Sequence, residues 1–161
     1  MGRASSRARP NVGTGTYSLR VTRLGALPAP CLLCGGTSGI HHPDGWHCAV
    51  CEWRVGDAPD PDLPLPRVHV VYYLRYADRV KIGTSANPRQ RLGAIWHHEL
   101  LAFEPGDRTV ERRRHAQFAQ LREGGEWFRA ADELIAHAAA LADGGDPWHA
   151  YARWFSAALR G

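Results

Sequence analysis

The sequence predicts an α+β fold in which a small antiparallel sheet of three strands is flanked by helices. Between residues 68 and 103, short runs rich in Val, Tyr and Ile are separated by turn-forming residues, which is typical of antiparallel strands. From residue 109 onward, apolar residues recur at helical spacing between breaks that contain Gly or Pro. The residues before this region include all four cysteines of the chain, and we expect them to form a compact unit of their own.

Prolines and turn residues divide the chain after the cysteines into a linker, strands and helices. The linker, residues 57–67, contains four prolines and three aspartates, so it is expected to be extended and semi-rigid. Asn87 is a natural N-cap and Pro88 suits the first helical position, so a helix is expected to begin there. The stretch EGGEWF is expected to break the chain between two later helices. The remaining expected elements are strands over 68–74, 79–84 and 99–103 and helices over 109–122, 130–142 and 148–159.

Positive charge is concentrated at the start of the chain. Residues 1–30 hold five arginines and no acids, a net charge of +5, and their Gly, Ala and Ser content favours a disordered arm. Residues 31–66 carry one arginine and five acids, net −4, and residues 67–142 carry twelve basic and nine acidic residues, net +3. A basic arm and a basic main domain favour a polyanionic partner such as nucleic acid, although a solvated basic surface explains the charge about as well.

The chain shows no signal for a membrane or for secretion. No apolar run approaches the roughly 20 residues that a bilayer span requires. The arginines near the N-terminus are not followed by the apolar stretch of a signal peptide. We therefore expect a cytoplasmic protein without a membrane partner, in which clustered cysteines indicate metal binding rather than disulfides.

The four cysteines form two Cys-x-x-Cys pairs. Cys31 and Cys34 are separated from Cys48 and Cys51 by thirteen residues. Each pair places two sulfurs on one side of a tight turn, and two such turns form a tetrahedral thiolate cage that suits Zn²⁺. Residues 31–56 therefore resemble a zinc ribbon, and four thiolates leave no open position, so the zinc would be structural. There are two alternatives: a nearby histidine replaces one cysteine as a ligand, or the cysteines act as a redox dithiol. The ribbon could bind nucleic acid, bind protein or only stabilise the fold.

Two polar residues of the first two predicted strands are expected to share one face of the sheet. Side chains alternate between faces along a strand, so Tyr72 lies on the same face as Val70 and Leu74. In the next strand, Lys81 shares a face with Gly83. Taken singly, these residues are explained by ordinary positions in a sheet, a half-buried aromatic ring and a solvated charge.

The order of these pieces resembles the GIY-YIG nuclease superfamily. VVY at 70–72 stands where that family has Gly-Ile-Tyr, and KIG at 81–83 stands where it has Tyr-Ile-Gly. A small hydroxyl residue follows, then Arg91 eight residues after the glycine, and Glu111 on a later helix. The likeness is strongest to the branch with a KIG core and a late GEWF, and it covers residues 68–129. It implies an α+β nuclease domain, here over residues 68–142.

The resemblance implies metal-dependent hydrolysis of DNA phosphodiester bonds at a site with one Mg²⁺ or Mn²⁺ ion. Glu111 would hold the ion, and Arg91 would grip the phosphate through its planar guanidinium. Tyr72 would relay a proton of the attacking water if a nearby cation favours its ionised form, and Lys81 could supply that cation. His115, one helical turn beyond Glu111, would orient the water or contact the phosphate.

Each of these residues also has an ordinary structural explanation. Glu111 could be a first-turn acid favoured by the helix dipole, Arg91 a solvated helix residue and His115 an i, i+4 partner of Glu111. Glu126 is interpreted as a supporting group behind the site or as a cap. A final set of arginines is expected to contact the DNA backbone: Arg89, Arg112 and Arg113.

Two other functions remain open. The chain could be a non-catalytic nucleic-acid-binding or regulatory protein on the same fold, or a zinc-ribbon scaffold for protein interactions. The C-terminal helix, within residues 146–161, favours a contact surface because it is unusually aromatic for its length. It is expected to pack onto the main domain or onto a protein partner through Trp148, Tyr151, Trp154 and Phe155.

Overall fold

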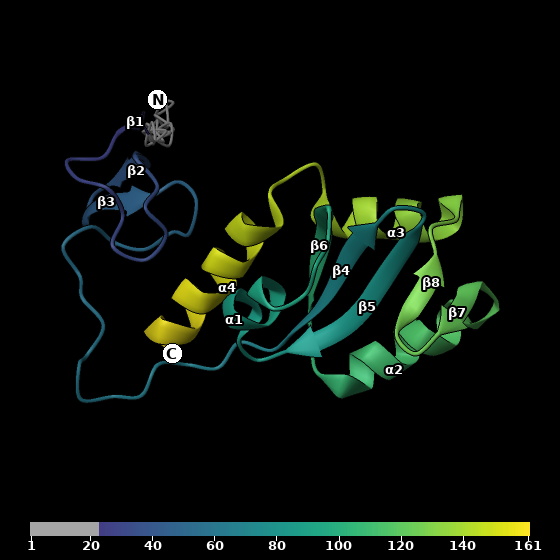
Figure 1. Ribbon diagram of the computed structural model, residues 1–161. Coiled ribbons are helices and arrows are strands. Elements are labelled where there is room, and N and C mark those ends of the chain that lie inside the picture. The colour runs from purple at the N-terminus through teal and green to yellow at the C-terminus, as the bar shows by residue number, and fades with distance from the viewer. Residues whose placement is uncertain (1–22) are drawn as a thin grey trace, which may run out of the picture.

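The computed structural model describes residues 23–161, and the predicted disorder of residues 1–22 lies outside the described residues (Figure 1). Within residues 23–161, the chain forms a three-stranded sheet of order β1-β2-β3 and a five-stranded sheet of order β6-β4-β5-β8-β7. All strand pairs are antiparallel. The predicted α+β class is confirmed, but the prediction of three strands in the main sheet is wrong, because it has five.

The small sheet belongs to the cysteine unit. Its strands are β1 (Arg23–Ala26), β2 (Ser38–His42) and β3 (Gly45–Cys48). The predicted arm, which extended to residue 30, is therefore too long, since β1 pairs with β2 and is ordered by those backbone hydrogen bonds. Gly25 also permits close packing, because a Cβ there would lie 2.9 Å from the Trp46 ring.

The main sheet is built on a long hairpin. Strands β4 (Val70–Tyr76) and β5 (Arg79–Ser85) pair along their whole length, and β6 (Glu99–Pro105) pairs with the other edge of β4. The stretch expected to break the chain instead forms a second hairpin of β7 (Arg122–Gly124) and β8 (Trp127–Arg129), with the two glycines of its turn at positive φ.

The helices begin close to their predicted positions. The bounds are α1 (Pro88–Gly93), α2 (Arg108–Gln117), α3 (Asp132–Ala142) and α4 (Pro147–Arg160). Asn87 caps α1 as predicted, since its side chain accepts a hydrogen bond from the Gln90 backbone. Helix α2 was expected to reach residue 122, but it ends at Gln117 and continues in a short 3₁₀ turn, Ala119–Leu121.

Each face of the main sheet is covered by two helices. Val71 and Tyr73 of β4 point into a core shared with α2 and α3, and Val70, Tyr72 and Leu74 point into a second core with α1 and α4. The predicted alternation along β4 is therefore confirmed. Among the described residues, no helix is long and apolar enough to cross a bilayer.

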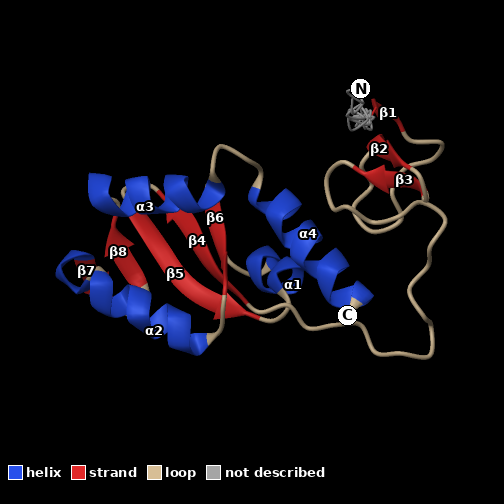
Figure 2. Cartoon of the chain, turned by 180° about the vertical axis from the view of Figure 1, so that it is seen from behind, coloured by secondary structure: helices blue, strands red, loops and turns tan. Residues whose placement is uncertain are grey.

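Helix α4 lies between the main sheet and the cysteine unit (Figures 1 and 2). Trp148 and Tyr151 pack on the second core of the main sheet, whereas Ala152 and Leu159 pack on the cysteine cluster. Arg160 donates a hydrogen bond to the Glu52 carbonyl at 3.2 Å. The helix thus packs onto the main domain, the first of its two predicted arrangements, and joins that domain to the ribbon-like unit.

Candidate functional site

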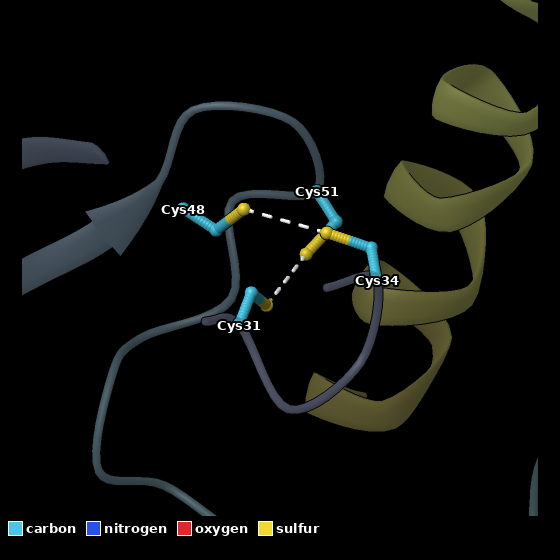
Figure 3. Close-up of side chains that lie close together, drawn as sticks. All are labelled: Cys31, Cys34, Cys48 and Cys51. Carbon is cyan, nitrogen blue, oxygen red and sulfur yellow. Dashed lines mark hydrogen bonds between the residues drawn. The ribbon is translucent and has the colours of Figure 1, made fainter. Parts of the chain in front are cut away.

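The four cysteines converge at one point of the small unit (Figure 3). Their sulfur atoms all lie within 4.8 Å of one another, and the Cys31–Cys51 and Cys34–Cys48 pairs are 3.5 Å apart. Tetrahedral coordination at a Zn–S length of about 2.3 Å separates neighbouring sulfurs by about 3.8 Å. The separations therefore fit a cage for one metal ion.

The cage is buried and closely surrounded by backbone. Cys48 and Cys51 are almost fully buried, and Trp53 packs in the same cluster. A Cβ on Gly36 would lie 3.1 Å from the Cys48 sulfur, so glycine lets the chain pass close to the cage. Burial raises the pKa of the Cys34 thiol to about 11, so a metal ion would have to displace protons to bind.

The histidines between the cysteine pairs take other partners. His47 contacts the Asp44 carboxylate at 3.1 Å, and the ring of His41 packs edge-on against Trp46. Within residues 23–161, the one group of three or more possible metal ligands consists of the four cysteines. The alternative in which a histidine replaces a cysteine therefore gains no support.

A polar cavity of about 420 Å³ opens beside β5, between α1 and α2. We call it the active pocket. Three of the five predicted catalytic residues line it, each from a different element: Tyr72 from β4, Arg91 from α1 and Glu111 from α2. The rest of its wall consists of Thr84, Arg108, Arg112 and Glu126.

The pocket exists because β8 is short. It pairs with β5 only from Arg79 to Lys81, so the later part of β5 has no neighbouring strand on that side. Backbone groups of Ile82 are satisfied in other ways: its N–H donates to the Glu126 carbonyl at 3.0 Å, and its carbonyl accepts from the His115 ring at 2.9 Å. Helix α2 is thereby held against the open strand, with its first turns along the pocket.

Tyr72 lines the pocket next to Arg91. It lies opposite Gly83 in the strand register, and a Cβ on Gly83 would lie 2.5 Å from the tyrosine hydroxyl oxygen, so only glycine leaves room for the ring. The Arg91 Nε donates to that hydroxyl at 3.3 Å, which raises the pKa of Arg91. Tyr72 is fully buried, so its hydroxyl lies at the inner wall of the pocket.

The cation beside Tyr72 is therefore Arg91, where Lys81 was expected. Lys81 does share the sheet face of Tyr72, as predicted. Its ammonium, however, contacts the Glu126 carboxylate at 2.6 Å and lies 5.5 Å from the centre of the Trp127 ring. Glu126 thus neutralises Lys81 while it lines the pocket.

His115 does not line the active pocket. Besides its hydrogen bond to the Ile82 carbonyl, its ring lies 5.0 Å from the Phe128 ring. Within residues 23–161 it forms no ion pair with Glu111, and the residues that line the pocket do not include it, so its contact with water or phosphate stays a prediction. Its contacts fix the position of α2 relative to β5.

The arginines expected to contact DNA are exposed but not equivalent. Arg112 lines the active pocket, Arg113 points to solvent, and Arg89 stacks over Trp148 at 4.8 Å. Arg114 instead pairs with the buried Glu104 carboxylate, with Nε donating at 3.0 Å. Tyr73 donates to the same carboxylate at 2.9 Å.

The positions of two arginines in α2 were not predicted, although the helical spacing indicates both of them. Arg114 lies four residues after Val110 and four before Phe118, both of which pack on the core, so it had to face the sheet. Arg108 lies three residues before Glu111 and thus on the pocket side of α2. Glu104 gave no signal, because a carboxylate in a strand is ordinarily solvated.

The pocket is rich in positive charge and contains one carboxylate that forms no ion pair within residues 23–161. Arg91, Arg108 and Arg112 outnumber its two carboxylates, and Glu126 is already paired with Lys81. Within residues 23–161, Glu111 takes part in no ion pair. A largely hydrated Mg²⁺ needs only one or two carboxylates besides substrate oxygens, so the donor set fits such an ion.

Comparison with known proteins does not extend this description. No protein-family model matches the chain, and no curated protein and no solved structure matches it either. The chemistry of the active pocket and of the cysteine cage therefore has to be interpreted from their own residues.

Proposed function

We propose that the chain is a metal-dependent DNA endonuclease of the GIY-YIG type. The supporting observation is that one cavity collects Tyr72, Arg91 and Glu111 from three separate structural elements. The resemblance in sequence names these same residues. An ordinary solvated arrangement of the three would not require them to meet, and the surplus of arginines around them suits a phosphate backbone.

The residues of the pocket divide the work of phosphodiester hydrolysis. A Mg²⁺ or Mn²⁺ ion held by Glu111 would neutralise charge on the phosphate and on the leaving oxygen. Arg91 can grip the scissile phosphate with its planar guanidinium, and Arg108 and Arg112 can hold neighbouring phosphates. Tyr72 can relay the proton of the attacking water, because its oxygen takes up that proton while the hydroxyl passes its own to a second water molecule or a phosphate oxygen.

The contact between Arg91 and Tyr72 supports an ordered sequence of events. In the structure, the Arg91 Nε donates a hydrogen bond to the Tyr72 hydroxyl at 3.3 Å. A phosphate that enters the pocket offers Arg91 a charged acceptor, which forms a stronger hydrogen bond than a neutral phenol. Substrate binding would thus weaken the hydrogen bond from Arg91 to Tyr72 and free the hydroxyl to bond with water when a phosphate is present.

We also propose that the cysteine cage holds a structural Zn²⁺. Four thiolates complete a tetrahedral site and leave no position for substrate or water. Since Ala152 and Leu159 of α4 pack against the same cluster, the ion would also stabilise the helix that covers the main sheet. Its role would be in folding and not in catalysis.

Cleavage assays test the nuclease directly. Pure protein is incubated with Mg²⁺ or Mn²⁺ and a panel of duplex, branched and single-stranded DNA, and Glu111→Gln is compared with Glu123→Gln, an exposed glutamate outside the pocket. We expect Glu111→Gln to lower the cleavage rate by on the order of a hundredfold or more, with Glu123→Gln close to the parent. Binding of DNA by the parent without cleavage of any substrate would favour a non-catalytic protein on this fold.

A further inference from the structure

The active pocket is the first of three adjoining cavities. It shares Thr84 and Arg108 with a second cavity of about 420 Å³. The second shares Ala86 with a third, of about 500 Å³. Together, the second and third cavities extend the pocket past the end of β5, and we call them the flanking groove.

The far end of the flanking groove is formed by parts of the chain outside the nuclease-like segment. Leu65, Pro66 and Arg67 come from the proline-rich linker, and Tyr151 and Phe155 come from α4. These segments meet there because α4 is packed on the main sheet by Trp148 and Tyr151. Its position gives the linker a surface to run along.

The flanking groove has an arginine near each end and two aromatic rings at its far end. Arg108 stands where it joins the active pocket, and Arg67 stands at the far end. Arg67 is exposed and forms no ion pair within residues 23–161. Beside it, the rings of Tyr151 and Phe155 are stacked with their centres 6.3 Å apart. Asp107 is the one acid on the wall, and its carboxylate already accepts a hydrogen bond from the Thr109 backbone.

Phe155 is available to a ligand in a way that Tyr151 is not. The Tyr151 ring packs against Phe103 of the second core, with ring centres 5.9 Å apart. Both residues are partly buried, but Phe155 is not among the residues packed on that core. Its ring therefore faces the cavity as a partly exposed aromatic surface.

We propose that the flanking groove holds an unpaired DNA strand on one side of the cleaved bond, with phosphates at Arg108 and Arg67 and a base against Phe155. This inference rests on the proposed nuclease function, which places a phosphate in the active pocket. Arginines spaced along a groove follow a phosphate backbone, and aromatic rings beside it stack with bases. In a duplex, the bases are already stacked and paired, so only an unpaired strand can use the Phe155 ring.

Binding measured apart from cleavage tests the groove. Fluorescence anisotropy follows a labelled single-stranded DNA of about 12 nucleotides, and its duplex form, with no divalent ion added and at several salt concentrations. Phe155→Ala is compared with Trp96→Ala, whose ring is 79% exposed and lies outside all three cavities. Arg67→Gln is compared with Arg129→Gln, an exposed arginine that lines none of them.

We expect Phe155→Ala to weaken single-strand binding on the order of tenfold, and duplex binding much less. For single-strand binding by Arg67→Gln, the plot of the log of the binding constant against the log of the salt concentration should be less steep by about 0.7. This is the change expected for one lost phosphate contact on a single strand. Both control variants should bind as the parent does. Because Arg67 is exposed, its replacement does not endanger folding and keeps the test valid if Phe155→Ala is unstable.

The outcomes distinguish a wrong assignment of the flanking groove from a wrong assignment of the nuclease function. Unchanged single-strand binding by both variants, in a protein that cleaves DNA, would overturn the groove and leave the nuclease intact. Equal losses for single strand and duplex would also overturn it, since they would indicate a duplex surface. Selective loss of single-strand binding, in a protein that cleaves nothing, would support the groove as a binding site and refute the nuclease.

Discussion

Removal of the Arg114 side chain should destabilise the fold far more than removal of its neighbour Arg113. Arg114 pairs with Glu104, a carboxylate that is only 7% exposed, and Tyr73 is bonded to the same group. Arg114→Ala leaves this carboxylate buried without its cation, which typically costs 3–5 kcal/mol. The arginine itself is 19% exposed, so we expect the lower end, about 3 kcal/mol, or a fall in Tm of roughly 6–12 °C.

The pH dependence gives this prediction a second readout. Burial tends to raise the pKa of Glu104, but hydrogen bonds from Arg114 and Tyr73 outweigh it and hold the pKa below its ordinary value of 4.5. Since the folded-state pKa is lowered, the stabilisation is present above the unfolded-state pKa and is lost as pH falls through the folded-state pKa. The gap in Tm between parent and Arg114→Ala should therefore narrow on acidification.

Thermal melts of the parent, Arg114→Ala and Arg113→Ala between neutral and acidic pH supply the measurement. Arg113 is the matched control because it is exposed and forms no ion pair within residues 23–161. The account of this network is refuted if the two alanine variants melt together, or if the gap between parent and Arg114→Ala does not change with pH.

Three further outcomes are expected. The purified protein should contain about one Zn²⁺ per chain by metal analysis, and Cys48→Ser should release it; a chain purified without chelator that holds no zinc contradicts the cage. Gly83→Ala should cost about 1–3 kcal/mol of unfolding free energy in denaturant melts, because the new methyl group collides with the Tyr72 hydroxyl; an unchanged midpoint contradicts that packing. Deletion of residues 1–22, which hold four arginines, should weaken DNA binding and flatten its salt dependence; equal salt slopes for both proteins contradict an electrostatic role of the arm.

Local sequence patterns predicted the elements that depend on local chemistry. The alternation of Val70 to Leu74 predicted the two faces of β4, and Asn87 with Pro88 predicted the start of α1. The spacing of the cysteines predicted their convergence. Each of these features depends on a few neighbouring residues or on the spacing of one residue type.

Features that depend on distant partners were predicted less well. Arg23–Ala26 has the composition of a flexible arm and is ordered only by pairing with β2. The three-residue strands of the second hairpin are too short to show alternation, and their glycines suggest a break. Lys81 pairs with Glu126, and Arg91 bonds to Tyr72, because of the way in which β8 and α1 pack against β5. Local sequence does not reveal that packing.

The central claim is that Glu111 holds a catalytic divalent ion, and the rate of DNA cleavage at limiting Mg²⁺ tests it most directly. Glu111→Gln keeps the size of the side chain but loses the charge that retains the ion. Because the cysteine cage is separate from the pocket, folding and zinc content should be unchanged. We predict that the parent cleaves and that Glu111→Gln is slower by on the order of a hundredfold or more at the same Mg²⁺ concentration. If Glu111→Gln cleaves as fast as the parent under limiting Mg²⁺, the active site has been assigned to the wrong residues.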